Sequence, residues 1–297
     1  MAYNKFRGLG NALITPFTKD GAVDYASLRR ILDYQLAGGI DFLCILATTG
    51  ETPCLTEDEK RRIIDIVLEK VHGTIPILMG CGGNNTMDIV NILHTHDFTG
   101  IDGILSVCPY YNKPSQEGLY QHFKTIANNT DLPVVLYNVP GRVGVNMTAE
   151  TTLRLANDCE NIVAIKEASG NFTQIDDIIK NKPEHFDVIS GDDGITFPLI
   201  TLGAVGVISV IGNALPHEFG RMVRLALRGD YQNALTIHHK FAELFKLLFV
   251  DGNPAGVKAM MNSMGLIENE LRLPLVPARL TTFGEISTII KELNIKY

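Results

Sequence analysis

The strongest constraint on the fold is an alternation that repeats eight times along the chain. Short apolar segments rich in Val and Ile are each followed by a segment whose apolar residues recur at helical spacing. The expected strands are residues 12–17, 42–47, 76–81, 103–108, 133–139, 162–168, 187–191 and 206–211. The helix-like segments are residues 24–37, 57–71, 86–96, 115–128, 148–157, 172–181, 196–202 and 216–227. Strands that are apolar on both faces are typical of parallel sheets covered by helices.

This pattern predicts an α/β protein, and eight such units fit a closed (β/α)8 or TIM barrel better than an open sheet. An open doubly wound sheet is the alternative, and it would usually carry a glycine fingerprint in its first strand-to-helix turn. The chain has no GxGxxG motif. Its nearest glycine cluster, Gly80–Gly83, lacks the last glycine of that motif and predicts a tight turn instead.

The alternation stops after Leu227, and three helical stretches follow without an intervening strand. These stretches are residues 231–249, 254–264 and 282–293, with a proline-containing linker at Leu271–Pro277. We therefore expect a catalytic barrel over residues 1–228 and a small C-terminal helical domain over residues 229–297.

Composition excludes several classes of protein. The formal net charge of −7 argues against a nucleic-acid partner or an anionic membrane surface, which would require an excess of Lys and Arg. No apolar run approaches the roughly 18 residues of a membrane span, and the first residues lack the apolar segment of a signal peptide. The five cysteines are scattered without a CxxC pair, so neither a metal site nor a disulfide framework is expected. These features predict a cytoplasmic globular protein.

Lys166 is the most informative single residue, because it directly follows four apolar residues of an expected strand. Most lysines are solvated surface charges, but a strand inside a barrel has no solvated face. Burial disfavours the charged form of a lysine, and an uncharged amine can form a Schiff base with a carbonyl substrate. Active sites of such barrels lie at the C-terminal ends of the strands, where Lys166 is expected.

Four further side chains are expected at the same ends of the strands. Alternation along two neighbouring strands places Tyr137 on the face of Lys166, although a tyrosine of the core with a satisfied hydroxyl is the simpler interpretation. Thr48 and Thr49 offer hydroxyl and backbone N–H donors to a carboxylate, but such residues are common in turns. Arg142 could hold a second carboxylate through two hydrogen bonds, or could be a solvated arginine.

Together these residues resemble the dihydrodipicolinate synthase / N-acetylneuraminate lyase family of class I aldolases over essentially the whole chain. The matching motifs are TTGE at Thr48–Glu51, PYYNKPSQEGLY at Pro109–Tyr120, YNVPGR at Tyr137–Arg142, IKEASG at Ile165–Gly170 and SGDD at Ser190–Asp193. The paired threonines, the paired tyrosines and Arg142 look like the synthase branch of the family. Ala47 and Val143 depart from the usual glycine and threonine without removing a functional group.

The resemblance implies condensation of pyruvate with L-aspartate 4-semialdehyde to 4-hydroxy-tetrahydrodipicolinate, in the biosynthesis of lysine and diaminopimelate, without a metal or other cofactor. It implies that Lys166 forms the Schiff base and that Tyr137 transfers protons. It also implies that Thr49 links Tyr137 to a tyrosine of a neighbouring subunit. That borrowed tyrosine is the residue equivalent to Tyr111. The substrate-binding positions that it implies are Thr48, Thr49, Arg142, Ile208 and Gly191.

The resemblance further implies a homotetramer built from tight dimers and an allosteric site for L-lysine. The residues expected at that site are Thr52, Lys60, Asn84, Asp88 and Tyr110. A lysine at position 60, where histidine is common, predicts weak feedback, and pairing of Lys60 with Glu57 would reduce the effect. Two alternatives remain open at this point: a sister aldolase that cleaves a sugar acid, and a barrel that binds a small acid without catalysis.

Overall fold

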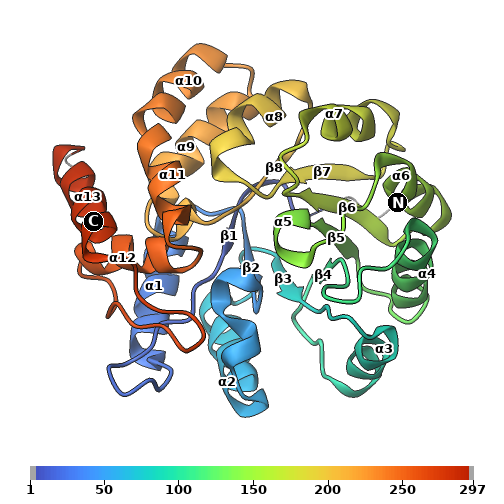
Figure 1. The fold of residues 1–297 in the computed structure, drawn as a ribbon, viewed down its shortest axis with the longest axis horizontal. Coiled ribbons are helices and arrows are strands. Elements are labelled where there is room, and N and C mark those ends of the chain that lie inside the picture. Colours follow the sequence, from blue (N-terminus) through green and yellow to red (C-terminus); the bar gives the residue numbers. More distant parts are fainter. Residues whose placement is uncertain (1–4, 294–297) are drawn as a thin grey trace.

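The computed structural model describes residues 5–293, which form a closed barrel of eight parallel strands surrounded by helices (Figure 1). Strands adjacent in sequence are adjacent in the sheet, and β8 pairs with β1 to close it. The strands are β1 Gly8–Ala12, β2 Phe42–Ile45, β3 Ile77–Gly80, β4 Gly103–Val107, β5 Val134–Asn138, β6 Ile162–Glu167, β7 Asp187–Ser190 and β8 Gly206–Ser209. The predicted (β/α)8 barrel is confirmed.

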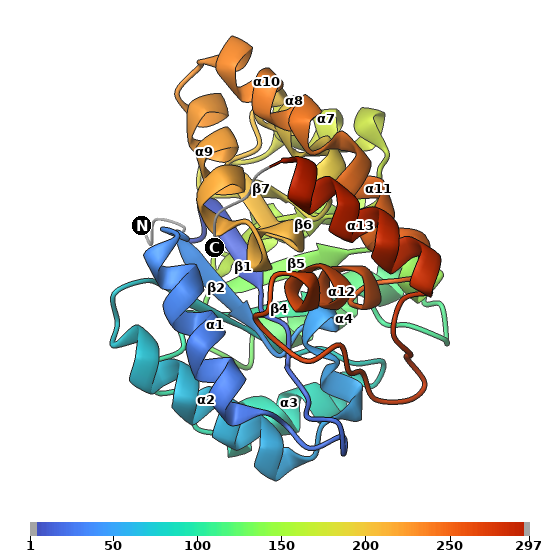
Figure 2. The ribbon, with the colours of Figure 1, turned by 90° about the vertical axis from the view of Figure 1, so that its left-hand side faces the viewer.

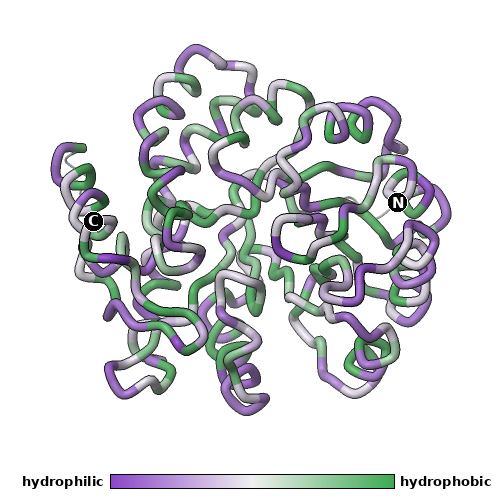
Figure 3. The backbone as a smooth tube through the Cα atoms, in the orientation of Figure 1, coloured by the Kyte–Doolittle hydropathy of each residue, from purple (hydrophilic) through white to green (hydrophobic). Residues whose placement is uncertain are grey.

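The helices that surround the barrel have polar outer faces and apolar inner faces (Figure 3). They are α1 Tyr25–Ala37, α2 Glu57–Val71, α3 Thr86–Thr95, α4 Gln116–Ala127, α6 Ala149–Asp158, α7 Phe172–Asn181, α8 Thr196–Leu202 and α9 Pro216–Leu227, with the short α5 Pro140–Val143 above the strands. Thr56 and Glu59 form a capping box at the start of α2. None of the helices in residues 5–293 is long and apolar enough to cross a membrane.

The first strand lies outside the expected range. We expected residues 12–17, but β1 is Gly8–Ala12, and the apolar segment after it leaves the barrel. The sequence of β1, GLGNA, lacks an apolar run because two positions are glycines and one is a buried asparagine. The amide nitrogen of Asn11 donates inside the protein to the side chain of Gln35 and to the carbonyl of Gly212. A polar strand of this kind has no hydrophobic signature.

The C-terminal region is helical, as expected, but its first stretch is two helices rather than one. Phe241 leaves the helical conformation and separates α10 Tyr231–Lys240 from α11 Ala242–Val250. The chain continues with α12 Ala255–Ser263 and α13 Leu280–Glu292, which lie together at one side of the barrel (Figure 2). Buried residues of α11, α12 and α13 belong to the same apolar cluster as residues of β1 and α1.

A fully buried ion pair attaches α12 to the loop after β2. Lys258 Nζ lies 2.5 Å from Glu51 Oε1 and also donates to the carbonyl of Glu270 at 2.9 Å. The other carboxylate oxygen of Glu51 accepts the backbone N–H of Arg272. Burial lowers the pKa of Lys258 to about 8, while Glu51 acts in the opposite direction. Breaking one side of such a pair would leave the other charge buried without compensation.

We predict that Lys258→Met lowers the free energy of unfolding by about 3–5 kcal/mol, because Glu51 would remain buried and unpaired. The double variant Glu51→Gln with Lys258→Met should recover most of that loss. Urea unfolding followed by circular dichroism measures both. Lys246→Met is the matched control, since Lys246 pairs with Glu243 on the exposed surface, and should change stability by at most about 1 kcal/mol. Equal losses in the single and double variants would contradict the prediction.

Candidate active site

Lys166 and Tyr137 face each other inside the barrel. The register of β5 with β6 pairs Tyr137 directly with Lys166, so both side chains project on the same face of the sheet. They are 6% and 5% exposed, respectively, and Lys166 Nζ lies 4.3 Å from the centroid of the Tyr137 ring. Within residues 5–293, Lys166 has no carboxylate partner. The expected proximity of the amine and the phenol is confirmed.

Close backbone packing surrounds the Lys166 side chain. Gly191, directly after β7, has no room for a side chain: a Cβ there would lie 3.1 Å from Lys166 Cε and 2.7 Å from Ala168 Cβ. Cys44 of β2 also lies in the barrel interior, and burial raises the pKa of its thiol to about 11. Ile208 is buried in β8, two strands from Lys166. The substrate-binding roles of Gly191 and Ile208 stay predictions.

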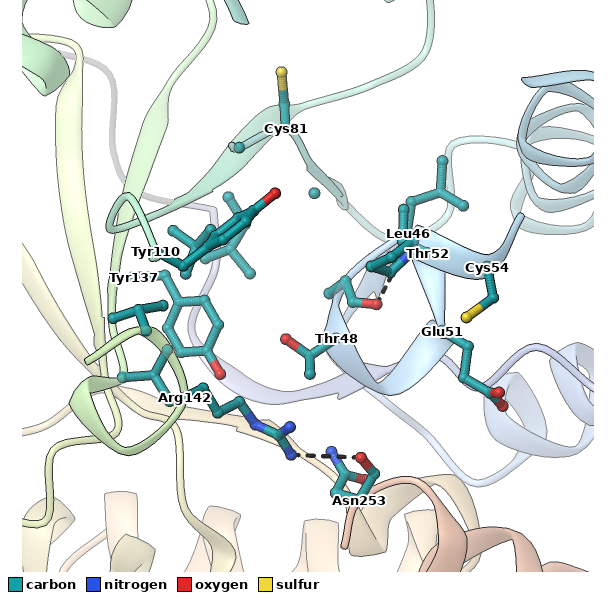
Figure 4. Close-up of a pocket in the computed structure, with 18 of the residues that line it drawn as sticks. Leu46, Thr48, Glu51, Thr52, Cys54, Cys81, Tyr110, Tyr137, Arg142 and Asn253 are labelled. Carbon is teal, nitrogen blue, oxygen red and sulfur yellow. Dashed lines mark hydrogen bonds between the residues drawn. The ribbon is translucent and has the colours of Figure 1, made fainter. Parts of the chain in front are cut away.

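A cavity of about 410 Å³ opens at the C-terminal ends of the strands. Thr48, Tyr137 and Arg142 face one another across it, and Asn253 lies beside Arg142 (Figure 4). Thr48 begins a short 3-10 turn, η1 Thr48–Gly50, and Arg142 lies on α5. Lys166 does not line the cavity, but its amine lies over the ring of Tyr137, and Tyr137 does line the cavity.

Asn253 connects two of the predicted site residues, although sequence reasoning missed it. Its side-chain Nδ2 donates to the Oγ1 of the buried Thr49 at 2.9 Å. Its main-chain carbonyl accepts a hydrogen bond from Arg142 Nη2 at 3.4 Å. The sequence offered no signal for this residue, because it lies 204 positions from Thr49, in the region that we expected to form a small C-terminal helical domain.

Tyr111 does not enter the cavity of its own chain. Its side chain is 90% exposed, on a backbone with φ of 72°. Among the hydrogen bonds of residues 5–293, none joins Thr49 to Tyr137 or to Tyr111. The relay through Thr49 to a neighbouring subunit's tyrosine therefore stays a prediction.

The expected allosteric residues divide between two adjacent cavities. Lys60 lines a second cavity of about 440 Å³ between α2 and α3, Tyr110 lines the first cavity, and Thr52 lines both. Asn84 donates to the carbonyl of Tyr110, and Asp88 lies exposed on the first turn of α3 and lines neither cavity.

The expected pairing at position 60 is confirmed. Lys60 forms an ion pair with Glu57 at 2.7 Å, and its hydrogen bond holds the pKa of that carboxyl below its usual range. Part of the charge of Lys60 is therefore already neutralised within its own helix.

The first cavity combines functional groups that suit a small oxo acid. A buried amine, a phenol, a threonine hydroxyl and a guanidinium lie in or next to it. No group of three His, Cys, Asp or Glu side chains in the described part of the chain could hold a metal ion. The arrangement can bind a carboxylate, form an imine and transfer protons.

Comparison with known proteins identifies the family. Residues 5–293 match the sequence model of the Dihydrodipicolinate synthetase family. The chain belongs to this family. A curated relative from Phocaeicola vulgatus, named 4-hydroxy-tetrahydrodipicolinate synthase, is 69% identical over 296 residues and covers 100% of both chains.

Two solved structures extend the likeness to the fold. Dihydrodipicolinate synthase from Thermotoga maritima has a TM-score of 0.95 at 44% identity, over 98% of this chain and 99% of that chain. A chloride-inhibited dihydrodipicolinate synthase from Acinetobacter baumannii, complexed with pyruvate, has a TM-score of 0.94 at 38% identity, over 98% and 99% of the two chains.

We predict that Gly191→Ala displaces Lys166, because the added Cβ would meet Lys166 Cε and Ala168 Cβ at the distances given above. The free energy of unfolding should fall by about 1–3 kcal/mol, and the rate of imine formation with pyruvate should fall more than tenfold. Urea unfolding and single-turnover trapping measure the two effects. Gly194→Ala is the control, because a Cβ there meets atoms only at 3.3 Å and beyond. An unaltered trapping rate in Gly191→Ala would show that Lys166 tolerates the extra methyl group.

Proposed function

We propose that this chain condenses pyruvate with L-aspartate 4-semialdehyde through a Schiff base on Lys166 and gives 4-hydroxy-tetrahydrodipicolinate. The observation that carries the proposal is the paired placement of Lys166 and Tyr137 beside a cavity that also presents Arg142. The name of the 69% identical relative supports the same activity. Intact amine, phenol and guanidinium groups argue against a barrel that only binds an acid.

The chemistry follows from these groups. The amine of Lys166 attacks the keto carbon of pyruvate, and loss of water leaves an iminium. The hydroxyl of Tyr137 protonates the departing water in that step and becomes a phenolate. The iminium withdraws electrons from the methyl group, so that this phenolate can accept a methyl proton and leave a nucleophilic enamine. The enamine attacks the aldehyde and forms the new carbon–carbon bond. The amino group of the second substrate then displaces Lys166 and closes the ring, which regenerates the free lysine.

In this proposal, the two threonines bind the carboxylate of one substrate and Arg142 binds the carboxylate of the other. Thr48 and Thr49 bind the carboxylate of pyruvate through their hydroxyl and N–H groups near the strand ends. Arg142 is exposed and lines the cavity, and it binds the carboxylate of the aldehyde, for which a planar guanidinium is well suited. This placement favours a short acidic aldehyde over a sugar acid, the substrate class of a sister aldolase.

Three expectations about organisation become proposals here. We propose that residues 229–297 work as part of the catalytic unit with the barrel of residues 1–228. Asn253 contacts Thr49, and Lys258 contacts Glu51, in the loop Thr48–Glu51 after β2, which we call the threonine loop. We propose a cytoplasmic location, in line with the expectation stated above. We also propose a homotetramer of tight dimers in which the exposed Tyr111 completes a neighbouring subunit's site.

We propose, in addition, that L-lysine inhibits weakly at a site that includes Thr52, Lys60, Asn84, Asp88 and Tyr110. The ammonium of an effector near Lys60 would meet a like charge. The ion pair between Lys60 and Glu57 offsets part of this repulsion, so weak rather than absent inhibition is expected.

The covalent step is tested by trapping. Borohydride added in the presence of pyruvate should attach a reduced pyruvate adduct to the peptide that contains Lys166, as measured by mass spectrometry. The buried Lys258 is an internal control, because its ion pair with Glu51 should keep it unmodified. In a coupled assay, wild-type protein should consume pyruvate with aspartate semialdehyde, N-acetylneuraminate should not be cleaved, and Lys166→Ala should lose nearly all activity. An adduct on another lysine would refute the proposal.

The assembly is tested by complementation. Tyr111→Phe and Lys166→Ala should each be inactive, the first through a lost relay and the second through a lost nucleophile. Mixed subunits should regain activity, because a hybrid dimer contains one site with an intact Lys166 and an intact borrowed tyrosine. Native mass spectrometry establishes that hybrids have formed. Inactive hybrids would place Tyr111 outside the relay or within its own subunit's site.

A further inference from the structure

Asn138, the last residue of β5, closes the base of the loop that carries Arg142. Its side chain is fully buried, and its Oδ1 accepts the backbone N–H of Met147 at 3.0 Å. Its Nδ2 donates to Asn146 Oδ1 at 2.9 Å and to the carbonyl of Met147 at 3.3 Å. The chain therefore leaves the sheet and returns to the same side chain. We call residues 139–146 the arginine loop.

The orientation of the Asn138 amide is fixed from both ends. A backbone N–H can only donate, so the amide atom that faces the N–H of Met147 is the oxygen. An ionised carboxylate can only accept, so the atom 2.5 Å from Glu167 Oε1 is the nitrogen. The amide nitrogen of Gln174, on α7, also donates to Glu167 Oε1 and to the carbonyl of Met147, each at 3.1 Å.

Glu167 attaches this arrangement to the end of β6. Its side chain is fully buried, and its Oε2 accepts the backbone N–H of Ser169 at 3.1 Å and the Ser169 hydroxyl at 2.6 Å. Burial raises the pKa of Glu167, whereas the hydrogen bonds from Ser169, Asn138 and Gln174 act in the opposite direction. The carboxylate thus joins β6 to the base of the arginine loop through neutral donors.

The strand ends themselves are held by the main chain. The N–H of Ala168 donates to the carbonyl of Asn138 at 2.9 Å, and the N–H of Gly191 donates to the carbonyl of Glu167 at 2.8 Å. These bonds join β5 to β6 and β6 to β7 without any side chain. The side chain of Asn138 is therefore not needed to keep the strands in register, and its contacts all serve the arginine loop and its anchor.

The arginine loop transmits this constraint to Arg142 through one turn of helix. In α5, the N–H of Gly144 donates to the carbonyl of Pro140, and the N–H of Arg142 donates to the carbonyl of Val139, both at 2.9 Å. The side chain of Arg142 is exposed and extends toward the cavity from this turn (Figure 4). An exposed side chain of this length is placed chiefly by the backbone that carries it.

We propose that Asn138 is a positioning residue for the second substrate, because its amide closes the arginine loop and holds Arg142 where the carboxylate of the aldehyde binds. This role rests on the proposed function, which assigns that carboxylate to Arg142. A binding group that is already in place avoids the free-energy cost of ordering it when the substrate arrives. Opening the base of the loop should therefore weaken binding of the aldehyde more than binding of pyruvate.

Asn138→Asp tests this role. The amide nitrogen has two hydrogens and faces three acceptors, whereas a carboxyl group has at most one. The acceptors of the arginine loop lose their donor, and the ionised carboxylate repels Glu167. We expect the KM for aspartate semialdehyde to rise tenfold or more, and the KM for pyruvate to stay within about threefold. Borohydride should still trap pyruvate on Lys166. The coupled assay and mass spectrometry measure these effects.

A double-mutant cycle shows whether the effect passes through Arg142. Arg142→Ala alone should raise the KM for aspartate semialdehyde. In that background, Asn138→Asp should change the same KM by less than about threefold, because no guanidinium is left to position. A general loss of structure would instead have its full effect in both backgrounds.

Asn161→Asp is the matched control. Asn161 directly precedes β6, at the opposite end of the barrel from the cavity. Its amide nitrogen also donates to two acceptors, the carbonyls of Ala127 and Thr130, each at 2.9 Å. The same substitution should lower stability here without changing either KM. Urea unfolding shows that each variant is folded under the assay conditions.

Three outcomes would overturn the proposal. They are an unchanged KM for aspartate semialdehyde in Asn138→Asp, an equal rise in the KM of both substrates, and a full effect of Asn138→Asp in the Arg142→Ala background. If Asn138→Asp does not fold, Asn146→Ala decides, since it removes a partner within the loop. A rise of at least threefold in the KM for the aldehyde alone supports the role, and a smaller change refutes it.

Failure of the proposed function gives different results. The wild-type protein would then neither condense the two substrates nor form an adduct with pyruvate. An unchanged KM for aspartate semialdehyde in Arg142→Ala would refute the proposed role of Arg142, and the role of Asn138 with it.

Discussion

Closure of the barrel is the constraint on which the site depends. Because every strand is paired on both sides, the register of each pair is fixed around the ring, and a slip of one residue would turn each side chain to the opposite face. The register of β5 with β6 sets Tyr137 beside Lys166 at the ends of their strands. The same closure excludes solvent from the lysine stem, and Gly191 provides the space beside it. The proximity of amine and phenol is therefore a property of the sheet rather than of a mobile loop.

Burial alone does not distinguish the proposed catalytic lysine of this protein from a structural one. Lys258 is more deeply buried than Lys166, yet its amine is held by Glu51 and by a backbone carbonyl. A lysine held in this way stabilises the fold, because its nitrogen hydrogens are engaged and its charge is balanced. Lys166 has an aromatic face as its neighbour and no carboxylate partner among residues 5–293. The partner, more than the depth, determines which lysine is available for chemistry.

Much of the fold could be predicted from the sequence because its signals are local. Hydrophobic periodicity predicted α2 with its correct bounds, and strand alternation predicted that Tyr137 and Lys166 lie on the same face. The first strand was misplaced because its sequence, GLGNA, has no apolar run, and its buried Asn11 is held by hydrogen bonds that no local pattern announces. Asn253 was missed for a related reason: its place beside the cavity depends on a contact 204 residues away in sequence, and no local pattern encodes that contact.

The loop after β2 shows why the C-terminal helices are close to the chemistry. Leu46 and Glu51, on either side of the two threonines, adopt left-handed backbone conformations that non-glycine residues rarely occupy. Such conformations persist only where surrounding contacts over-determine them. Here the contacts come from α12 and the segment before it, since Lys258 holds Glu51 and Asn253 holds Thr49. The barrel provides the lysine and the tyrosine, whereas the conformation of the threonine loop depends on residues that a barrel alone would not contain.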